Sequence, residues 1–373
     1  MEIDWQKTER ILVVRLRSIG DTVLTTPSLI SLRKFLPKAR IDILLEDWVA
    51  PVMDGFDAVD NVITVSKSAK DRAIVARKLR SEKYDVAFNL HGGTTATFFV
   101  RASGAKHRVG YSNYRYSFLY NHLLSSSADF WEKEKTHSAE QQLALLGFVG
   151  VPVKERPKSF LAVTENASSS LIRKITAKTQ RRNGIDESGA VNAESAAGSL
   201  GSIEGEEILS ASDSTIALLH PVAAFATKQW DTEKFARIAE FLSEKGFRVA
   251  AVGTEKERTV LEKLKDLSKA EVITFDDLTL PEITALASRS AIFIGNDSGI
   301  AHIAAAVKTP SVVIFGSSNR DHWRPWTDAP NEIVYEEFSC QPCPGYVCEE
   351  FAEPKCILSV NVEDVKAAIT RLI

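Results

Sequence analysis

Short apolar runs alternate with helical patterns along most of the chain. In the first half, β-prone apolar runs occupy residues 11–16, 41–45, 61–65 and 86–90, and amphipathic patterns cover about 20–36 and 70–82. Continuous apolar runs of this length indicate strands that are buried on both faces. Their alternation with helices is typical of βαβ units, so we predict a parallel sheet covered by helices.

The second half repeats this plan. Apolar runs at 215–219, 248–252, 291–294 and 311–315 predict four further buried strands. Residues 231–245 and 362–372 have amphipathic helical spacing, and Thr254 and Glu257 have the spacing of a capping box. The prediction is a second doubly wound α/β domain, in which ligands bind at the carboxyl ends of the strands. A cleft between the two domains is the expected site.

A change of composition separates the halves. Residues 181–214 are rich in Ser, Gly, Ala and Glu and contain almost no large apolar side chains. Such a segment cannot bury enough surface to offset its ordering entropy, and we predict a disordered insert. The predicted domains are therefore 1–160 and 215–355, joined by a linker over 161–214 and followed by a C-terminal helical segment over 356–373.

Composition and charge narrow the class of protein. The 373 residues are 44% hydrophobic and 25% charged, which is a globular composition long enough for two domains. The net charge of -3 argues against a protein-wide electrostatic grip on nucleic acid. Residues 1–10 lack the apolar core of a signal peptide, and no apolar run reaches the length of a membrane helix. We expect a soluble intracellular protein.

Gly20 and Asp21 directly follow the first predicted strand, where a helix begins. Asp21 has two interpretations at this point. It is an N-cap of the helix, or it is a general base that takes a proton from a hydroxyl nucleophile. The segment lacks a GxGxxG pattern, which argues against a dinucleotide oxidoreductase or an epimerase that depends on such a cofactor.

Lys228 lies in the loop after the first strand of the second half. It is either an ordinary solvated lysine or a cation placed to meet a diphosphate.

Residues 295–302, GNDSGIAH, follow a buried strand and open an apolar helix. Backbone N–H groups at Ser298 and Gly299 suit a phosphate, Asp297 suits sugar hydroxyls, and His302 lies one turn further on. The alternative is that Asp297 or Ser298 only caps the helix and His302 packs locally.

Together these motifs resemble those of the heptosyltransferases, glycosyltransferase family 9. The resemblance rests on RLRSIGDTVLTTP at 15–27, KQW at 228–230 and GNDSGIAH at 295–302. It extends to YDVAFNLHGG at 84–93, RVGY at 108–111 and HSAE at 137–140, and covers nearly the whole chain outside 181–214. One departure is Ala223 and Ala224, where some members carry two threonines.

The resemblance implies a GT-B architecture, with two Rossmann-like domains and a C-terminal helix that crosses back to the first. It implies an inverting, metal-independent transfer of heptose from ADP-heptose to a lipopolysaccharide inner-core acceptor. The implied catalytic residues are Asp21, as the base, and Lys228, at the donor phosphates. The implied donor-binding residues are Gly20, Glu257 (at the ribose), Asp297, Ser298, Gly299 and His302.

The acceptor side is less defined by the sequence. We place it on His91, Gly92 and Arg115, within the stretches 91–94 and 111–115. The expected partners are the nucleotide sugar and a lipid-linked core oligosaccharide, met through peripheral contact at the inner face of the cytoplasmic membrane, with no nucleic acid and no cofactor. Two alternatives remain: a nucleotide-sugar-binding protein of the same fold without transfer activity, and a transferase of a different sugar to a cell-surface glycan.

All four cysteines, Cys340, Cys343, Cys348 and Cys356, fall within one short segment. Their spacing is close to that of metal sites, but the second pair lacks the usual two to four intervening residues. A reducing cytoplasm disfavours disulfides. Reduced thiols, a structural zinc and disulfides remain open, and a metal here would be outside the active site.

Overall fold

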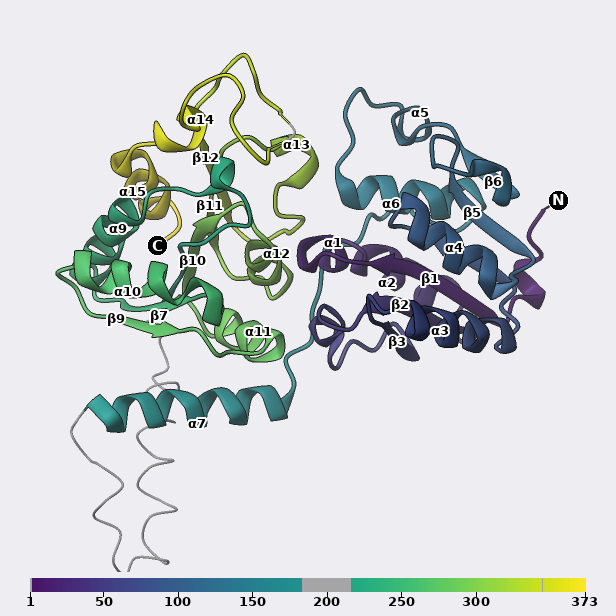
Figure 1. Ribbon diagram of the computed structural model, residues 1–373, viewed down its shortest axis with the longest axis horizontal. Coiled ribbons are helices and arrows are strands. Elements are labelled where there is room, and N and C mark those ends of the chain that lie inside the picture. Colours follow the sequence, from purple (N-terminus) through teal and green to yellow (C-terminus); the bar gives the residue numbers. More distant parts are fainter. Residues whose placement is uncertain (1, 183–215, 344) are drawn as a thin grey trace, which may run out of the picture. The chain divides into compact units, whose positions relative to one another are not determined.

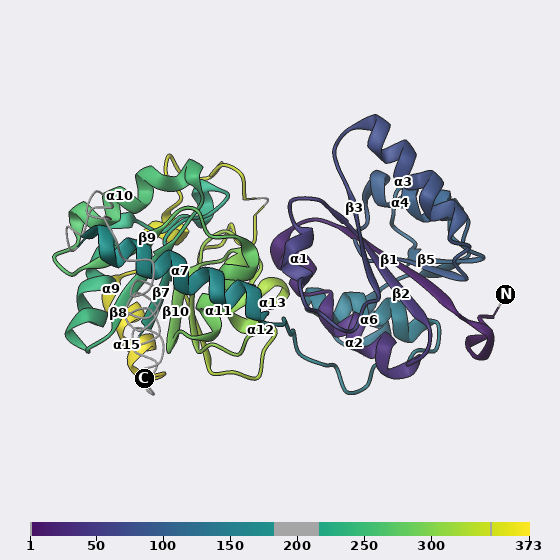
Figure 2. The ribbon, with the colours of Figure 1, turned by 90° about the horizontal axis from the view of Figure 1, so that it is seen from below.

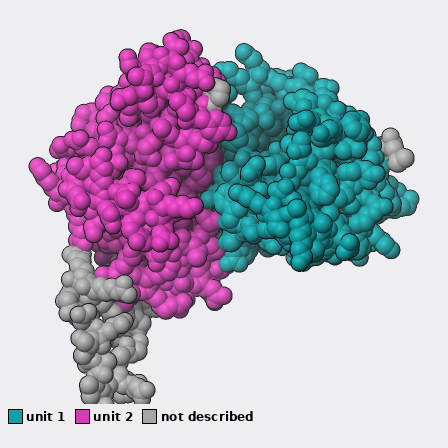
Figure 3. Space-filling view, in the orientation of Figure 1, with its two compact units in different colours: residues 1–162, 319–328 teal, residues 163–318, 329–373 magenta. Residues whose placement is uncertain are grey.

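The computed structural model describes residues 2–182, 216–343 and 345–373, which form two compact units. Unit 1 comprises Met1–Ala162 and Asn319–Asp328, and unit 2 comprises Val163–Ser318 and Ala329–Ile373 (Figure 3). The predicted insert over 181–214 lies almost wholly outside the described residues. Each unit is a six-stranded parallel sheet with helices on both faces (Figures 1 and 2), which confirms the α/β prediction.

Unit 1 has the strand order β3-β2-β1-β4-β5-β6. α3 and α4 pack together over one face, where Val75, Leu79, Phe99 and Val100 join the buried core, and α2 and α6 pack against each other. The strands are β1 (Arg10–Leu16), β2 (Arg40–Glu46), β3 (Asn61–Val65), β4 (Val86–Asn89), β5 (His107–Tyr111) and β6 (His122–Leu124). The helices are α1 (Ile19–Val23), α2 (Thr26–Phe35), α3 (Ala69–Ser81), α4 (Gly93–Ser103), α5 (Ser127–Trp131), α6 (Ser138–Phe148) and α13 (Arg320–Trp323), with short 3-10 turns η1 (Trp5–Lys7), η2 (Ala50–Met53) and η3 (Ser117–Leu119).

Unit 2 has the order β12-β11-β10-β7-β8-β9, the same topology as unit 1. α9, α10 and α15 bury their apolar sides in one core, and α12 packs on β10 and β11. The strands are β7 (Ile216–His220), β8 (Arg248–Val252), β9 (Val272–Phe275), β10 (Ile292–Asn296), β11 (Ser311–Phe315) and β12 (Asn331–Tyr335). The helices are α7 (Glu165–Arg182), α9 (Thr232–Glu244), α10 (Arg258–Leu267), α11 (Leu280–Ser288), α12 (Gly299–Ala306), α14 (Lys355–Leu358) and α15 (Val362–Thr370), with 3-10 turns η5 (Ala226–Lys228) and η6 (Glu255–Glu257).

Two segments differ from the sequence-based expectation. Part of the linker expected over 161–214 is the helix α7, which buries Ala167, Leu171 and Ile175 at helical spacing and packs on α11 in unit 2. Only three buried apolar residues form this stripe in an otherwise polar segment, so the composition of the segment did not indicate a packed helix. The C-terminal helix α15 packs on α9, β11 and β12 of unit 2, because Val365, Ala368 and Ile369 complete that core. The segment that belongs to unit 1 is instead 319–328.

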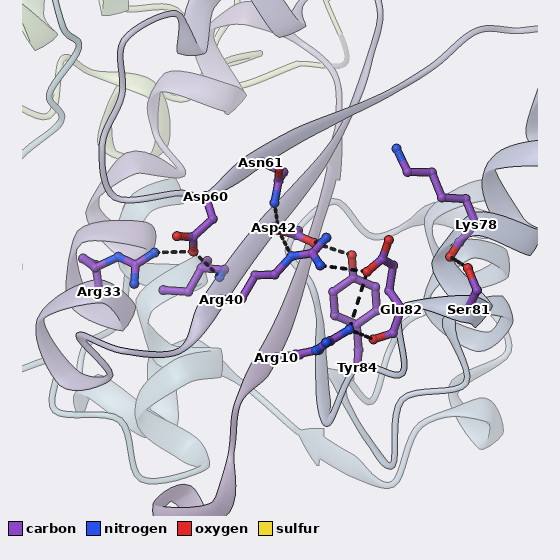
Figure 4. Close-up of polar contacts among 11 residues, drawn as sticks. Arg10, Arg33, Arg40, Asp42, Asp60, Asn61, Lys78, Ser81, Glu82 and Tyr84 are labelled. Carbon is purple, nitrogen blue, oxygen red and sulfur yellow. Dashed lines mark hydrogen bonds and ion pairs between the residues drawn. The ribbon is translucent and has the colours of Figure 1, made fainter.

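A network of charged side chains closes the amino end of the unit 1 sheet (Figure 4). Asp42 is fully buried and pairs with Arg40 through both carboxylate oxygens, at 2.8 and 3.1 Å. The Tyr84 hydroxyl (2.6 Å) and the Asn61 amide (2.9 Å) also donate to Asp42, and Glu82 holds the other side of Arg40 at 2.8 Å. Burial and the Asp42 charge together raise the pKa of Tyr84. This hydrogen-bonded network stabilises the amino end of the sheet.

Candidate active site

The sequence motifs lie where the strand order of each sheet reverses. In unit 1 the reversal falls between β1 and β4, and in unit 2 between β7 and β10. Asp21 follows β1 and His91 follows β4, while Lys228 follows β7 and Asp297 follows β10. In doubly wound sheets, ligands bind at the carboxyl ends of the strands at this point. Each unit therefore carries candidate chemistry at its topological binding position.

Unit 1 contains a pocket of about 460 Å³ at the carboxyl ends of its strands. This volume falls within the range of about 300–1,000 Å³ found for small-molecule sites. The lining residues are mostly hydroxyl, amide, imidazole and aromatic groups. They are Arg15, Asp21, Leu90, His91, Tyr111, Asn113, Tyr114, Ser125, Ser126, Ser127, Ser138, Gln141, Gln142, Leu145, His322 and Trp323.

Asp21 is fixed within this pocket from two sides. The pairing of β1 with β2 shifts register between Val14 and Leu16, which places Arg15 at an irregularity of the strand. Arg15 donates to the Leu90 carbonyl and forms an ion pair with Asp21. The Ser18 hydroxyl donates to the other Asp21 oxygen at 3.0 Å in a capping box, so Asp21 is the third residue of α1 and not its N-cap. The carboxylate is one-fifth exposed and is held in a fixed position.

His91 is positioned by the end of β4. The Asn89 side-chain oxygen accepts from the backbone N–H groups of His91 (3.1 Å) and Gly92 (2.9 Å). Gly92 has φ +72°, and a Cβ at that position would lie 3.2 Å from the Tyr114 ring, so glycine is required for the turn. Burial, with a smaller contribution from the Arg15 cation, lowers the pKa of His91 to about 4. The imidazole is therefore neutral at physiological pH.

Not all of the expected acceptor residues meet in the pocket. His91 lines it, whereas Gly92 and Arg115 are not among the lining residues. Gly92 instead shapes the turn, and the Arg115 guanidinium lies 5.5 Å from the ring centroid of Tyr116 on the surface. The sequence reasoning missed Gln142, the serines 125–127, and His322 with Trp323. Gln142 lies two residues after the HSAE segment, which was a usable signal in the sequence. No local pattern ties residues 322 and 323 to unit 1.

In unit 2, Lys228 and Asp297 are partners. The Lys228 ammonium lies 2.7 Å from Asp297 Oδ2, and the two side chains are 22% and 6% exposed. η5 presents Lys228, and Asp297 directly follows β10, where its N–H donates to the Ile314 carbonyl. A bound ligand can contact either member of this ion pair, the Lys228 ammonium or the Asp297 carboxylate.

The N-terminus of α12 lacks a side-chain cap. Ser298 occupies the N-cap position, but its hydroxyl lies 3.0 Å from His220 Nδ1 and makes no capping hydrogen bond. Burial lowers the pKa of His220 to about 4, so this imidazole is neutral. His302, further along the helix, is buried. An uncapped helix N-terminus that opens with Ser298 and Gly299 suits an anion.

Glu257 and Gly20 complete the expected donor set. Glu257 follows β8, the strand beside β7, and its Oε2 accepts from the Thr254 N–H and hydroxyl, both at 2.8 Å. This confirms the capping box and commits one carboxylate oxygen. Gly20 lies in α1 of unit 1, next to Asp21, whereas the other five residues expected to bind the donor lie in unit 2.

The four cysteines are free thiols that lie near one another. Burial raises the pKa of the Cys356 thiol, and the neighbouring thiols of Cys340, Cys343 and Cys348 raise it further. Across the described ranges, however, no group of three or more His, Cys, Asp or Glu side chains is arranged to hold a metal ion. The structure thus gives no support to the zinc hypothesis. None of the described helices is both long and apolar enough to cross a membrane.

The structure contains two Rossmann-like units, with a fixed carboxylate in one and a Lys–Asp pair beside a helix N-terminus in the other, which is the two-domain architecture of GT-B glycosyltransferases. The chain belongs to glycosyltransferase family 9 (heptosyltransferase), whose family model matches residues 72–352.

Relatives agree with this assignment, and solved structures share the fold. Lipopolysaccharide heptosyltransferase 3 of Escherichia coli is 29% identical over 331 residues, covering 84% of this chain and 85% of the relative. A glycosyltransferase family 9 structure from Veillonella parvula shares the fold with a TM-score of 0.75 at 20% identity, covering 100% and 98% of the two chains. The structure of E. coli ADP-heptose lps heptosyltransferase II gives a TM-score of 0.74 at 17% identity, covering 97% and 98%.

Proposed function

We propose that this enzyme transfers heptose from ADP-heptose to a sugar hydroxyl of the lipopolysaccharide inner core, with inversion at the anomeric carbon. Family membership supports the reaction class, and relatives named lipopolysaccharide heptosyltransferase support the donor and acceptor. The observation that carries the proposal is the Asp21 carboxylate, held by Arg15 and Ser18 inside a pocket of sugar-binding character. In this proposal unit 1 binds the acceptor and unit 2 binds the donor.

Asp21 acts as the general base. It accepts the proton of the acceptor hydroxyl while that oxygen bonds to the anomeric carbon of the donor. The bond between that carbon and the β-phosphate oxygen breaks, and ADP leaves with the electron pair. Arg15 orients the carboxylate and Ser18 holds its second oxygen, so the base is in place before the acceptor binds.

Unit 2 stabilises the leaving group. Lys228, released from Asp297 by the incoming donor, meets the diphosphate, and the uncapped N–H groups at Ser298 and Gly299 add the positive end of α12. Asp297 is then able to accept hydrogen bonds from sugar hydroxyls, and Glu257, in η6 after β8, binds the donor ribose. These groups supply the charge stabilisation without a metal ion or other cofactor.

Peripheral membrane contact is a further part of the proposal. Phe118 is 78% exposed, and it packs edge-on against Tyr116, whose ring lies under the Arg115 guanidinium. An exposed aromatic pair with a cation suits the interface of an anionic membrane. Binding to vesicles of anionic lipid should weaken in Phe118→Ser, with the exposed Ile373→Ser as a matched control. Equal vesicle binding by the wild type, Phe118→Ser and Ile373→Ser would contradict the proposed membrane contact.

The function is tested by release of ADP from ADP-heptose in the presence and absence of a heptose-terminated core acceptor. We expect ADP release that depends on the acceptor, and a loss of roughly 10²-fold or more in kcat/KM for Lys228→Ala. Donor binding without turnover on any core acceptor would instead favour the binding-protein alternative. Turnover with other nucleotide sugars, but not with ADP-heptose, would indicate a transferase of a different sugar.

A further inference from the structure

The segment that carries the four cysteines, residues 340–356, is hydrogen-bonded to the turn that presents Lys228. The Thr227 hydroxyl donates to the Gly345 carbonyl and accepts from the Ser317 hydroxyl at 3.1 Å. The backbone adds a second link, because the Ser317 N–H donates to the Thr227 carbonyl at 3.2 Å. Thr227 and Ser317 are each only 1% exposed, so these bonds are shielded from water. The residue before Lys228 is therefore tied to two other segments of unit 2.

The cysteine segment is in turn held at the end of β11. The Gln341 side-chain amide donates to the Gly316 carbonyl at 2.6 Å, and the Cys343 N–H donates to the Ser317 carbonyl at 3.1 Å. Gly345 has φ +89°, and a Cβ on it would lie 3.1 Å from the Ser317 hydroxyl. Both the backbone conformation and the available space thus require glycine where the chain meets Thr227.

η5 is a single 3-10 turn, which has few hydrogen bonds of its own to fix the lysine that it presents. The Lys228 N–H donates to the Phe225 carbonyl at 3.0 Å, and the Phe225 ring packs edge-on against Tyr346 of the cysteine segment, with the ring centroids 4.7 Å apart. In the proposed function the donor diphosphate replaces Asp297 beside the Lys228 ammonium. The backbone of η5 must then determine where the ammonium lies.

Trp230 anchors the chain on the other side of Lys228. Its backbone N–H donates to the Asn296 side-chain oxygen at 3.0 Å, and its indole N–H donates to the Val360 carbonyl at 2.9 Å. The KQW motif therefore accounts for one of the two anchors of the lysine. The other anchor is Thr227, which lies outside that motif.

From these contacts we propose that Thr227 is a positioning residue of the transferase, through which the cysteine segment holds Lys228 at the donor diphosphate. The inference rests on the proposed function and deepens it, because it gives the cysteine segment a part in donor binding. The links use hydroxyl, amide and carbonyl groups of Thr227, Ser317 and the cysteine segment rather than its thiols.

The first test combines Thr227→Val with Lys228→Ala and measures the Kd of ADP by titration calorimetry. Valine keeps the shape of threonine without its hydroxyl, so Thr227→Val should raise the Kd about fivefold, and Thr227→Ser should restore most of that loss. When Lys228 is already alanine, Thr227→Val should change the Kd by less than about twofold, because no ammonium remains to be positioned. A purely structural role would weaken ADP binding equally in both backgrounds, and that result overturns the inference.

The second test reaches the same link from the cysteine segment. Gly345→Ala places a Cβ against Ser317 and strains a left-handed backbone, and we expect it to raise the Kd of ADP about fivefold. Gly246→Ala is the matched control in unit 2, since Gly246 has φ +87° and a Cβ on it would meet no atom within 4 Å. The control should bind ADP within about twofold of the wild type. Equal effects of the two substitutions overturn the inference.

The same titrations separate the inference from the proposed function. Weak ADP binding by Lys228→Ala, beside a folded Thr227→Val protein that binds ADP as tightly as the wild type, overturns the inference alone. ADP binding by Lys228→Ala that equals that of the wild type overturns the proposed contact between Lys228 and the diphosphate, and the inference with it.

Discussion

The two ends of the unit 1 sheet each contain an arginine–aspartate pair with one buried member, but the pairs have different surroundings. At the amino end, Asp42 receives hydrogen bonds from Arg40, Asn61 and Tyr84 (Figure 4), and the described residues leave no buried polar atom of that group without a partner. At the carboxyl end, Arg15 and Asp21 pair beside His91 and Gln142, and buried polar atoms of Arg15, His91 and Gln142 lack partners.

This difference separates a structural use of charge from a functional one. Buried polar groups are nearly always hydrogen-bonded in native proteins, because an unsatisfied group costs about 1–3 kcal/mol. The unsatisfied atoms around the pocket are therefore groups that water or a ligand completes. The amino end stabilises the sheet, and the carboxyl end keeps hydrogen-bonding capacity at the site where we propose that the acceptor binds.

The sharpest test of the comparison is Asp21→Asn. Asparagine keeps an oxygen for Arg15 and turns its amide N–H towards the Ser18 hydroxyl, which can accept, but it cannot take the acceptor proton, so kcat/KM should fall by about 10³-fold. The free energy of unfolding, measured with urea, should change less than in Asp42→Asn. Wild-type turnover in a folded Asp21→Asn protein would contradict the assignment of the base.

Asp42→Asn should have the opposite profile. It leaves Arg40 and Tyr84 without a buried carboxylate, and unfolding in urea should cost about 3 kcal/mol less than in the wild type. The kcat/KM of the protein that remains folded should stay within twofold of wild type. A loss of kcat/KM equal to that of Asp21→Asn would contradict the distinction between the amino and carboxyl ends of the unit 1 sheet.

A smaller effect concerns pH and His91, whose pKa burial lowers to about 4. An unfolded histidine titrates near pH 6.5, so between these values the unfolded chain binds a proton that the native protein does not. The contribution of His91 to stability is complete above about pH 6.5 and is lost as the pH falls towards 4. Between pH 7 and 5, wild type should lose about 1–2 kcal/mol more than His91→Gln in urea unfolding. Parallel curves for the two proteins would mean that His91 is not desolvated.

The smallest effect is expected for Glu82→Gln at the rim of the amino-end network. Glu82 is partly exposed, and Arg40 keeps both bonds to Asp42 when the Glu82 charge is removed. We expect the free energy of unfolding, measured with urea, to fall by about 0.5 kcal/mol, and by less in high salt. A loss as large as that of Asp42→Asn would show that the whole network acts as one unit.

Much of the fold follows from the sequence. The eight predicted strands are all present, and the strands that were not predicted are β5, β6, β9 and β12. Three of these are edge strands, where a short or partly polar run such as Asn331–Tyr335 gives little signal. The helical pattern over 20–36 divides into α1 and α2, because Pro27 stands in the first turn of α2 and lacks the N–H of a continuous helix.

The candidate site was predictable only where its residues are contiguous in sequence. Asp21 and Lys228 lie in the segments that follow β1 and β7, and GNDSGIAH begins at the end of β10, so topology alone places them at the carboxyl ends of strands. The pairing of Lys228 with Asp297 joins residues 69 positions apart, and local pattern cannot reveal it. The same limit hid His322 and Trp323, because residues 319–328 join unit 1 only through tertiary packing.

The division of the chain has a consequence for recombination between relatives. The polypeptide passes between the units after residues 162, 318 and 328. The returning piece supplies His322 and Trp323, and His137 of unit 1 stacks on its Trp326 at 4.6 Å. A chimera made with a single crossover would take most of the pocket from one parent and the segment 319–328, with His322 and Trp323, from the other. If unit 1 binds the acceptor as proposed, exchange of acceptor preference between family members requires a double graft, of residues 1–162 together with 319–328.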